Sequence, residues 1–167
     1  MSVDRRPHIL VVAGAGGHSK ECLRLVDLLG EAKYRYSYVL EASDPFSEQQ
    51  IRVPGRVHRV VRPSYVKERR IIRDSLKFGW CVLQGGVILL RTRPDAVITT
   101  GPALAVPVSL VAKLLGVRIF FIETGSRIHR LSATGRIMRY LADLFFVQWE
   151  DLLPAAPRRA RFAGRLF

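Results

Sequence analysis

The sequence predicts an α/β domain with a parallel sheet, because apolar runs alternate with segments of helical periodicity along its 167 residues. The first run, residues 8–13, leads into a glycine turn and then into an amphipathic segment that ends at Leu29. A later run, residues 117–122, is apolar except for Arg118, as expected of a buried parallel strand. We therefore expect one Rossmann-like domain over residues 1–167, with helices on both faces of its sheet.

The other elements follow from the same patterns. Residues 36–42 form a predicted strand that ends in the turn signal Ser43-Asp44-Pro45. Shorter strands are expected over residues 57–61, 96–99, 144–148 and, at the C-terminus, 161–167. Helices are expected over residues 69–90, 106–115 and 132–141.

Composition narrows the class of protein. The formal net charge is +13, and arginine supplies 22 of the 27 cationic residues. This balance favours an anionic partner such as nucleic acid, a membrane surface or a phosphate-rich substrate. Cys22 and Cys81 lie far apart and lack the short spacing of a metal site, so we expect reduced core cysteines and no metal. No apolar run reaches 18 residues, and the polar start of the chain does not resemble a signal peptide.

The glycine turn after the first strand is a candidate anion site. It contains Gly14, Gly16 and Gly17, followed by His18 and Ser19 at the start of the predicted helix. Glycines leave backbone amides open, and a helix N-terminus attracts anions. The third glycine of a dinucleotide fingerprint would fall at Ser19, and no P-loop lysine follows. A tight turn without a ligand is the alternative.

A second candidate segment follows the strand over residues 117–122. It runs Glu123-Thr124-Gly125-Ser126-Arg127 and lies where open α/β sheets bind ligands, at the carboxyl edge. Capping of a neighbouring backbone N–H group by Glu123 is the alternative, and the sequence leaves both interpretations open.

The basic and apolar segment over residues 67–90 predicts an interfacial helix. One of its apolar stripes packs on the sheet in this interpretation, and it contains Ile72, Leu76, Trp80, Leu83, Val87 and Leu90. The other contacts a membrane with the cations beside it, and this predicted contact set is Ile71, Phe78, Val82, Leu89, Arg70, Arg73 and Lys77. Burial by a partner protein or in the core is the alternative.

Five motifs in order carry a resemblance to a known family. They are Gly14-Ala-Gly16-Gly17-His18, Arg93-Pro94-Asp95, Thr100-Gly101-Pro102 with Pro107, Phe121-Ile122-Glu123, and Ala142-Asp143. The chain resembles the asparagine-linked glycosylation 14 family, and more closely the bacterial accessory subunits of two-chain capsular and exopolysaccharide glycosyltransferases. It is also similar to the N-terminal half of the peptidoglycan glycosyltransferase that makes lipid II.

The resemblance implies the N-terminal half of a GT-B fold, peripheral on the cytoplasmic face of the membrane. Such a half binds a polyprenyl-diphosphate-linked saccharide, and a separate donor-binding subunit holds the UDP-sugar at the shared cleft. By this resemblance the chain is not active alone, and no cofactor is expected. His18 and Glu123 would be catalytic. The acceptor and its diphosphate would contact Gly14, Gly16, Gly17, Ser19, Gly101, Pro102, Ser126 and Arg127.

Three other functions remain open from the sequence. The first is a non-catalytic membrane scaffold that localises and activates a partner glycosyltransferase. The second is a nicotinamide-dependent enzyme, in which Glu41 would hold the ribose, although the missing third glycine argues against it. The third is a nucleic-acid-binding domain, which only the charge suggests because no stacking or recognition motif is present. We therefore expect no nucleic-acid partner.

Overall fold

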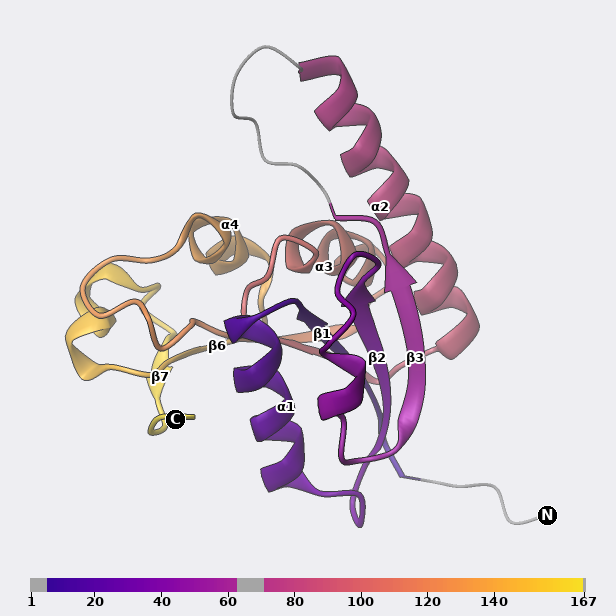
Figure 1. The fold of residues 1–167 in the computed structure, drawn as a ribbon. Helices are drawn as coiled ribbons and strands as arrows, with labels where there is room; N and C mark the ends of the chain where they lie inside the picture. The colour runs from indigo at the N-terminus through magenta and orange to yellow at the C-terminus, as the bar shows by residue number, and fades with distance from the viewer. Residues whose placement is uncertain (1–5, 63–70, 167) are drawn as a thin grey trace.

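The computed structural model describes the backbone of residues 6–62 and 71–166, and all of their side chains except those of 71–73. Its strands form one parallel sheet in the order β3-β2-β1-β4-β5-β6-β7 (Figure 1). The strands are β1 (His8–Gly14), β2 (Arg35–Glu41), β3 (Gly55–Val60), β4 (Ala96–Thr99), β5 (Arg118–Ile122), β6 (Leu144–Val147) and β7 (Arg161–Phe162). The predicted fold class is confirmed.

Helices cover both faces of this sheet. The helices of the described residues are α1 (Gly17–Leu29), α2 (Ile71–Thr92), α3 (Ala105–Leu114) and α4 (Ala133–Leu141), with short 3-10 segments η1 (Glu48–Gln50) and η2 (Glu150–Ala155). Figure 1 shows α1 on one face and α2, α3 and α4 on the other. α3 packs between α2 and α4.

The two faces of β1 explain its continuous apolar run. Leu10 and Val12 belong to the core under α2, α3 and α4, whereas Ile9 and Val11 belong to the core under α1. Successive side chains of a strand point to opposite faces, so a strand covered on both sides needs apolar residues at every position. Cys22 and Cys81 are buried, one in each core.

Two aspartates fix the starts of neighbouring strands. The Asp95 carboxylate accepts a hydrogen bond from the backbone N–H of His8 at 2.7 Å, at the start of β1. Asp143 accepts one from the N–H of Ile119 at 2.8 Å, at the start of β5, and also pairs with Lys113 at 2.6 Å. These interactions give the Arg93-Pro94-Asp95 and Ala142-Asp143 motifs a structural role at the amino edge of the sheet.

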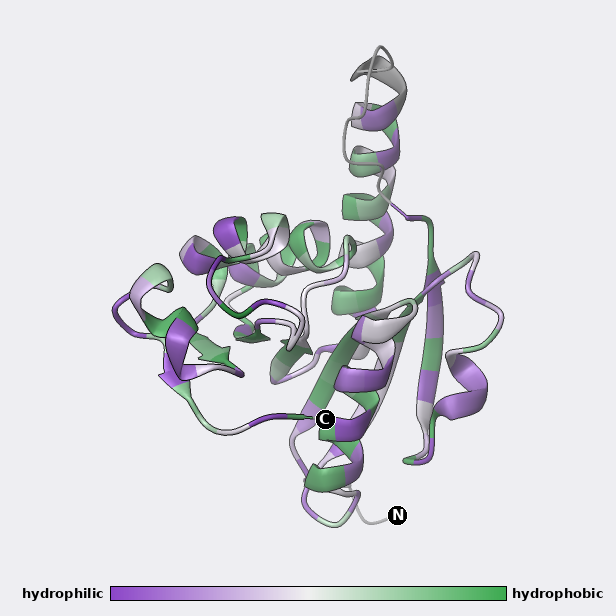
Figure 2. Ribbon diagram, turned by 60° about the vertical axis from the view of Figure 1, so that its left-hand side comes forward, coloured by the Kyte–Doolittle hydropathy of each residue, from purple (hydrophilic) through white to green (hydrophobic). Residues whose placement is uncertain are grey.

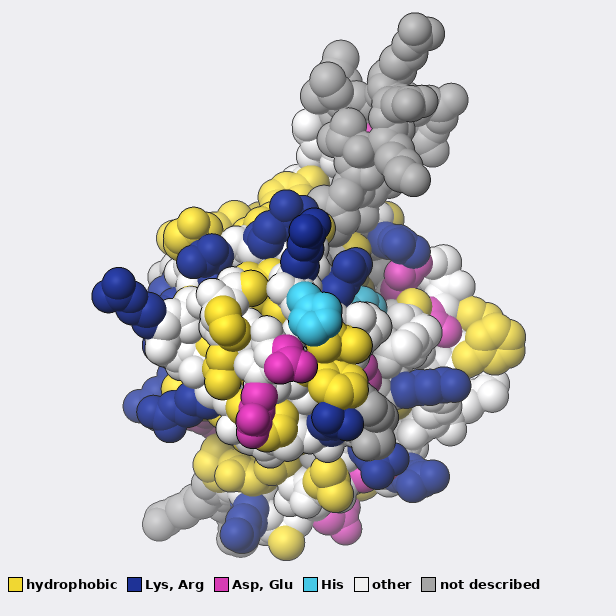
Figure 3. Space-filling view, turned by 90° about the vertical axis from the view of Figure 1, so that its left-hand side faces the viewer, with side chains coloured by type: hydrophobic (Ala, Val, Ile, Leu, Met, Phe, Trp, Pro, Cys, Tyr) yellow, Lys and Arg dark blue, Asp and Glu magenta, His cyan; other side chains and the backbone are white. Residues whose placement is uncertain are grey.

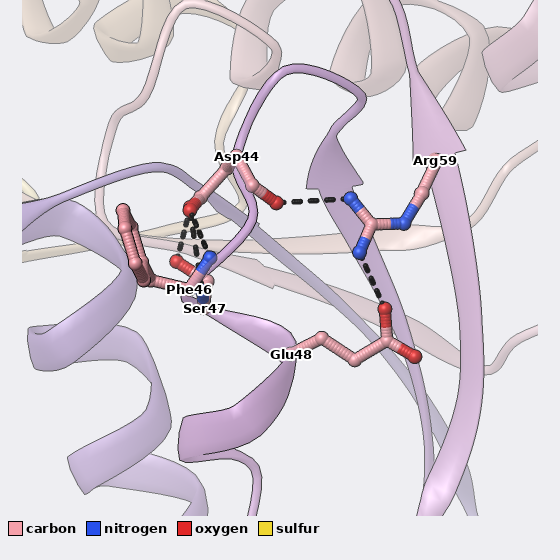
Figure 4. Close-up of polar contacts among 5 residues, drawn as sticks. All are labelled: Asp44, Phe46, Ser47, Glu48 and Arg59. Atoms are coloured by element: carbon pink, nitrogen blue, oxygen red, sulfur yellow. Dashed lines mark hydrogen bonds and ion pairs between the residues drawn. The ribbon is translucent and has the colours of Figure 1, made fainter.

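The turn predicted after β2 is built around Asp44 (Figure 4). Its carboxylate accepts hydrogen bonds from the N–H groups of Phe46 at 2.9 Å and Ser47 at 3.2 Å. Arg59 of β3 donates to the Asp44 carbonyl at 2.9 Å and pairs with Glu48 at 2.6 Å. Burial opposes ionisation of Asp44, but the hydrogen bond from the Ser47 hydroxyl, the two N–H bonds and Arg59 keep the pKa of its carboxyl below the ordinary value.

The predicted boundaries differ from the structure mainly at the ends of elements. β3 begins at Gly55 rather than at residue 57. β7 has two residues, whereas the prediction covered 161–167, because an exposed segment with Gly164 at φ +98° follows it. Of the predicted helix over residues 69–90, the part before residue 71 lies outside the described residues, and α2 continues to Thr92.

The predicted division of apolar side chains on α2 is wrong. Leu89 is only 2% exposed and lies in the core, and Phe78 packs against the same core. The exposed apolar row is Leu76, Trp80, Leu83, Val87 and Leu90. Figure 2 shows hydrophobic residues along α2, including the part that extends beyond the rest of the domain.

Close packing of two helices explains this orientation. Gly85 faces α3, where an added Cβ atom would lie 3.2 Å from Cγ2 of Val108. Cys81, one turn earlier, is fully buried. The small residues thus set the buried side of α2, and periodicity alone cannot choose between two apolar stripes.

The other residues of the predicted membrane contact are placed as follows. Lys77 and Val82 are half-buried, and Arg70 and the side chains of Ile71 and Arg73 lie outside the described residues.

Candidate functional site

The candidate site lies where the chain reverses its direction across the sheet. From β1 the chain moves outward to β2 and β3, and it then returns to β4 on the other side of β1. Such a switch point opens a crevice at the carboxyl ends of the two central strands. The loops after β1 and β4 meet there, and they contain the glycine turn and the Thr100-Gly101-Pro102 motif.

Glycine conformation allows these two loops to approach closely. Gly14 has φ +70°, and an added Cβ atom would lie 2.3 Å from Cβ of Pro102. Gly16, with φ +67°, precedes the first residue of α1, and no side chain caps this helix end. Gly16 and Gly17 are exposed. The first N–H groups of a helix lack intrahelical acceptors, so this end of α1 offers donors to an anion.

His18 is held by two reciprocal hydrogen bonds to Thr100. Its Nδ1 lies 2.9 Å from the Thr100 carbonyl oxygen, and the Thr100 hydroxyl donates to the His18 carbonyl at 2.8 Å. A carbonyl oxygen only accepts, so Nδ1 carries the hydrogen and Nε2 of the neutral ring keeps its lone pair. Within the described part of the chain, Nε2 has no hydrogen-bond partner. The half-buried ring therefore presents a fixed proton acceptor at the switch point.

Ser19, Gly101 and Pro102 shape the site without facing solvent. Ser19 is fully buried, and its hydroxyl donates to the Ala13 carbonyl at 3.4 Å. Gly101 has φ +90°, and an added Cβ atom would lie 3.3 Å from the Phe121 ring. All three residues are buried, so they are placed to support the loops from inside rather than to face a ligand, and Pro102 does so against Gly14.

Glu123 follows the capping interpretation rather than the catalytic one. It is fully buried, and its two carboxylate oxygens accept hydrogen bonds from the N–H groups of Thr124 and Ser132, both at 3.1 Å. Burial raises the pKa of its carboxyl, and the hydrogen bonds from Ser132 and Thr124 and nearby Arg127 oppose this shift. Because no part of the side chain is exposed, the expectation that Glu123 lines the cleft is corrected.

Glu21 is a site residue that the sequence reasoning missed. It lies one turn after His18 on α1, and its Oε1 accepts hydrogen bonds from the Thr124 hydroxyl at 3.1 Å and the Gly125 N–H at 3.0 Å. Its Oε2 is buried and has no hydrogen-bond partner among the described residues. Glu21 thus ties the His18 helix to the loop after β5. The only feature of the sequence that could have indicated this role is an acidic residue one turn into the predicted helix.

The loop between β5 and α4 presents polar residues at the same edge. Ser126 and Arg127 are exposed, and their contact with a ligand stays a prediction. Thr124 is hydrogen-bonded to both of these residues. Its hydroxyl oxygen lies 3.3 Å from that of Ser126, and its carbonyl accepts a hydrogen bond from the Arg127 N–H at 3.0 Å. Trp149 supports the loop by donating to the Gly125 carbonyl at 2.7 Å.

No group of three or more His, Cys, Asp or Glu side chains is arranged to hold a metal ion in the described part of the chain. None of the helices described is both long and apolar enough to cross a membrane.

The family of the chain follows from comparison with known proteins. The family model described as "Oligosaccharide biosynthesis protein Alg14 like" matches residues 9–166. The chain belongs to the Alg14-like family. It is 32% identical over 181 residues to the UDP-N-acetylglucosamine transferase subunit ALG14 of Homo sapiens and 31% identical over 175 residues to that of Schizosaccharomyces pombe. These alignments cover 95% and 94% of this chain and 82% of each relative.

Solved structures confirm the fold of this Alg14-like chain. MurG of Acinetobacter baumannii superposes with a TM-score of 0.75 at 18% identity, covering 94% of this chain and 45% of MurG. The UDP-GlcNAc 2-epimerase of Neisseria meningitidis, solved with UDP-GlcNAc bound, gives 0.69 at 14% identity, covering 95% and 47%. The chain therefore spans slightly less than half of these structures and matches the N-terminal half of the GT-B fold.

Proposed function

We propose that the chain is the acceptor-binding subunit of a two-chain, membrane-associated transferase. The enzyme would transfer N-acetylglucosamine from UDP-N-acetylglucosamine to a polyprenyl-diphosphate-linked saccharide. The observation that carries this proposal is the open glycine turn at the start of α1 beside the free Nε2 of His18. The names of the curated relatives, which are UDP-N-acetylglucosamine transferase subunits, support the donor and the need for a partner.

In this proposal the acceptor diphosphate binds at the N-terminus of α1. Gly16 and Gly17 give its oxygens access to backbone N–H groups, and Ser126 and Arg127 lie at the rim. The acceptor hydroxyl attacks the anomeric carbon of the donor as the bond to the UDP oxygen breaks. His18 Nε2 accepts the hydroxyl proton during this attack. Gly14, Ser19, Gly101, Pro102 and Glu123 act as positioning residues.

The membrane contact in this proposal is the exposed row of α2 rather than the stripe predicted from the sequence. Leu76 and Trp80 are 70% and 54% exposed, and the row continues through Leu83, Val87 and Leu90. Arg91, in the last turn of the helix, is also exposed. An apolar row with cationic neighbours in a chain of net charge +13 suits an anionic membrane surface.

The donor-binding partner would cover an apolar hollow on the opposite face. The hollow has a volume of about 450 Å³ and lies between α1, the uncovered side of β5 and β6, and the C-terminal segment. Its wall includes Leu28, Phe120, Ile122, Phe146 and Leu166. Leu28 is 71% exposed, and no described helix covers this part of the sheet. The matched structures are about twice as long as this chain, which supports the need for a second chain.

Acceptor binding can be tested with the chain alone. Nanodiscs of neutral lipid would contain either polyprenyl-diphosphate-N-acetylglucosamine or the same amount of polyprenyl monophosphate. We expect tighter binding to the diphosphate-linked sugar and a loss of at least about tenfold in Gly16→Val, because valine resists the positive φ of Gly16. Gly30→Val, with φ +68° at the other end of α1, is the matched control. Equal affinity for both nanodiscs would contradict the proposal.

A further inference from the structure

Four arginines surround a hollow beside the β5–α4 loop, and one of them, Arg127, is also the rim residue of the proposed acceptor site. The hollow lies between the β5–α4 loop, α4 and η2 and has a volume of about 460 Å³. It is lined by Arg127, Arg130, Leu131, Arg136, Arg139 and Ala155. No acidic side chain and no residue of the glycine turn is among these. Figure 3, which views the side of the molecule that carries α4, η2 and β7, shows cationic side chains distributed over this face.

The fold brings the four guanidinium groups together from two elements. Arg136 and Arg139 are three residues apart on α4, so they share one side of the helix. Arg127 and Arg130 come from the preceding loop, whose ends are held by the Arg127 N–H bond to Thr124 and by the Glu123 contact with Ser132. The two pairs therefore face one hollow from a supported loop and a packed helix.

None of these four arginines forms a salt bridge within the described part of the chain, although Arg127 lies close enough to Glu123 to act on its carboxyl. The ion pairs found there involve Arg52, Arg59, Arg62 and Lys113, and none includes an arginine of this hollow. Like charges repel one another, more strongly the closer they lie. Four cations around one hollow repel in several pairs at once. A bound anion would replace this repulsion with attraction.

We propose that this arginine pocket binds a phosphate or diphosphate group. Guanidinium groups donate paired hydrogen bonds that match phosphate oxygens, and several of them can serve one group with multiple charges. The volume lies within the range of small-molecule sites. Leu131 and Ala155 add an apolar surface for whatever organic group the phosphate carries. The phosphate could be that of a soluble metabolite or of a lipid headgroup.

Calorimetric titration of the full chain with inorganic pyrophosphate tests the pocket. We expect saturable binding that weakens at least tenfold in Arg136→Gln/Arg139→Gln. The matched control is Arg56→Gln/Arg118→Gln, which removes the same charge from exposed positions on β3 and β5 and should bind within about twofold of the parent. Arg136→Lys/Arg139→Lys keeps the charge but lacks the planar guanidinium group, so it should lose part of the affinity. This second variant keeps the test valid if the glutamine variant fails to fold.

A second arm identifies the source of the phosphate. Vesicles of neutral lipid would be doped with one of two anionic lipids at equal total charge. One is phosphatidic acid, a phosphomonoester, and the other is phosphatidylglycerol, a phosphodiester. A preference for phosphatidic acid that Arg136→Gln/Arg139→Gln removes assigns the pocket to a lipid headgroup. Pyrophosphate binding without that preference assigns it to a soluble phosphate. The proposal is overturned if neither probe binds saturably, or if the two glutamine pairs lose affinity equally. The acceptor site at the glycine turn has its own test in Gly16→Val, so loss of the Arg136/Arg139 dependence overturns this pocket without deciding the proposed transferase function.

Discussion

Several carboxylates of this Alg14-like chain hold backbone N–H groups at the ends of strands. Asp95 and Asp143 do so at the amino edge of the sheet, and Glu123 does so at the carboxyl edge. His18 is different, because Thr100 fixes one ring nitrogen and leaves the other open. At the scale of single residues, the acids position the loops and the histidine offers the reactive atom.

The raised pKa of Glu123 predicts a pH dependence of stability. Its carboxyl has a higher pKa in the folded than in the unfolded chain, so the folded state binds more protons. The resulting contribution is fully present below the unfolded value of about 4.3 and falls as the pH rises through the folded value. As the pH rises through the pKa of Glu123 in the folded chain, we expect the unfolding free energy of the parent to fall relative to that of Glu123→Gln. Urea denaturation between pH 4 and 8 measures this difference, and parallel curves would contradict the prediction.

Gly14 predicts a large cost for adding one methyl group. In Gly14→Ala the side chain would meet Pro102 at 2.3 Å in a left-handed backbone conformation. Backbone strain and overpacking should together lower the unfolding free energy by at least about 2 kcal/mol. Gly17→Ala is the control, because an added Cβ atom there has no contact within 4 Å. Chemical denaturation of both variants tests this, and a cost below 0.5 kcal/mol for Gly14→Ala would be inconsistent with the close approach.

At the scale of elements, α2 shows where sequence patterns stop being informative. The existence of α2 and the approximate position of its C-terminal end were predictable from its apolar periodicity. Its orientation was not, because two apolar stripes were available and close packing against Val108 at Gly85 decided which one is buried. The same holds for Glu123, whose position at the strand end was predictable while its cap on Ser132 depended on where α4 begins. Contacts between elements, rather than periodicity, determine such details.

The exposed row of α2 predicts membrane binding that two substitutions should remove. We expect the parent to bind anionic vesicles and Trp80→Glu/Leu83→Glu to lose at least tenfold in affinity, since two large apolar contacts are lost and acidic charge is added. Leu28→Glu/Phe46→Glu makes the same exchange at exposed positions on other surfaces and should bind as the parent does. Cosedimentation measures both variants. Retained binding by Trp80→Glu/Leu83→Glu would exclude this row as the membrane contact.

At the scale of the whole molecule, the apolar hollow beside α1 predicts where the partner binds. Leu28→Glu should weaken association with the donor-binding chain at least tenfold, because it introduces charge into an apolar contact. Trp80→Glu, on the other face of the sheet, should leave association unchanged. Analytical ultracentrifugation of the two chains provides the measurement. If the two variants associate equally well, the hollow is not the contact.

The division of work between two chains is the central claim, and reconstituted sugar transfer tests it most directly. Vesicles with polyprenyl-diphosphate-N-acetylglucosamine would receive UDP-N-acetylglucosamine, this chain and its donor-binding partner, with product quantified by mass spectrometry. We predict that product requires both chains and that His18→Gln lowers the rate 10²- to 10⁴-fold without weakening their association. An unchanged rate in His18→Gln would contradict the acceptor-site account and favour a scaffold that leaves all chemistry to its partner.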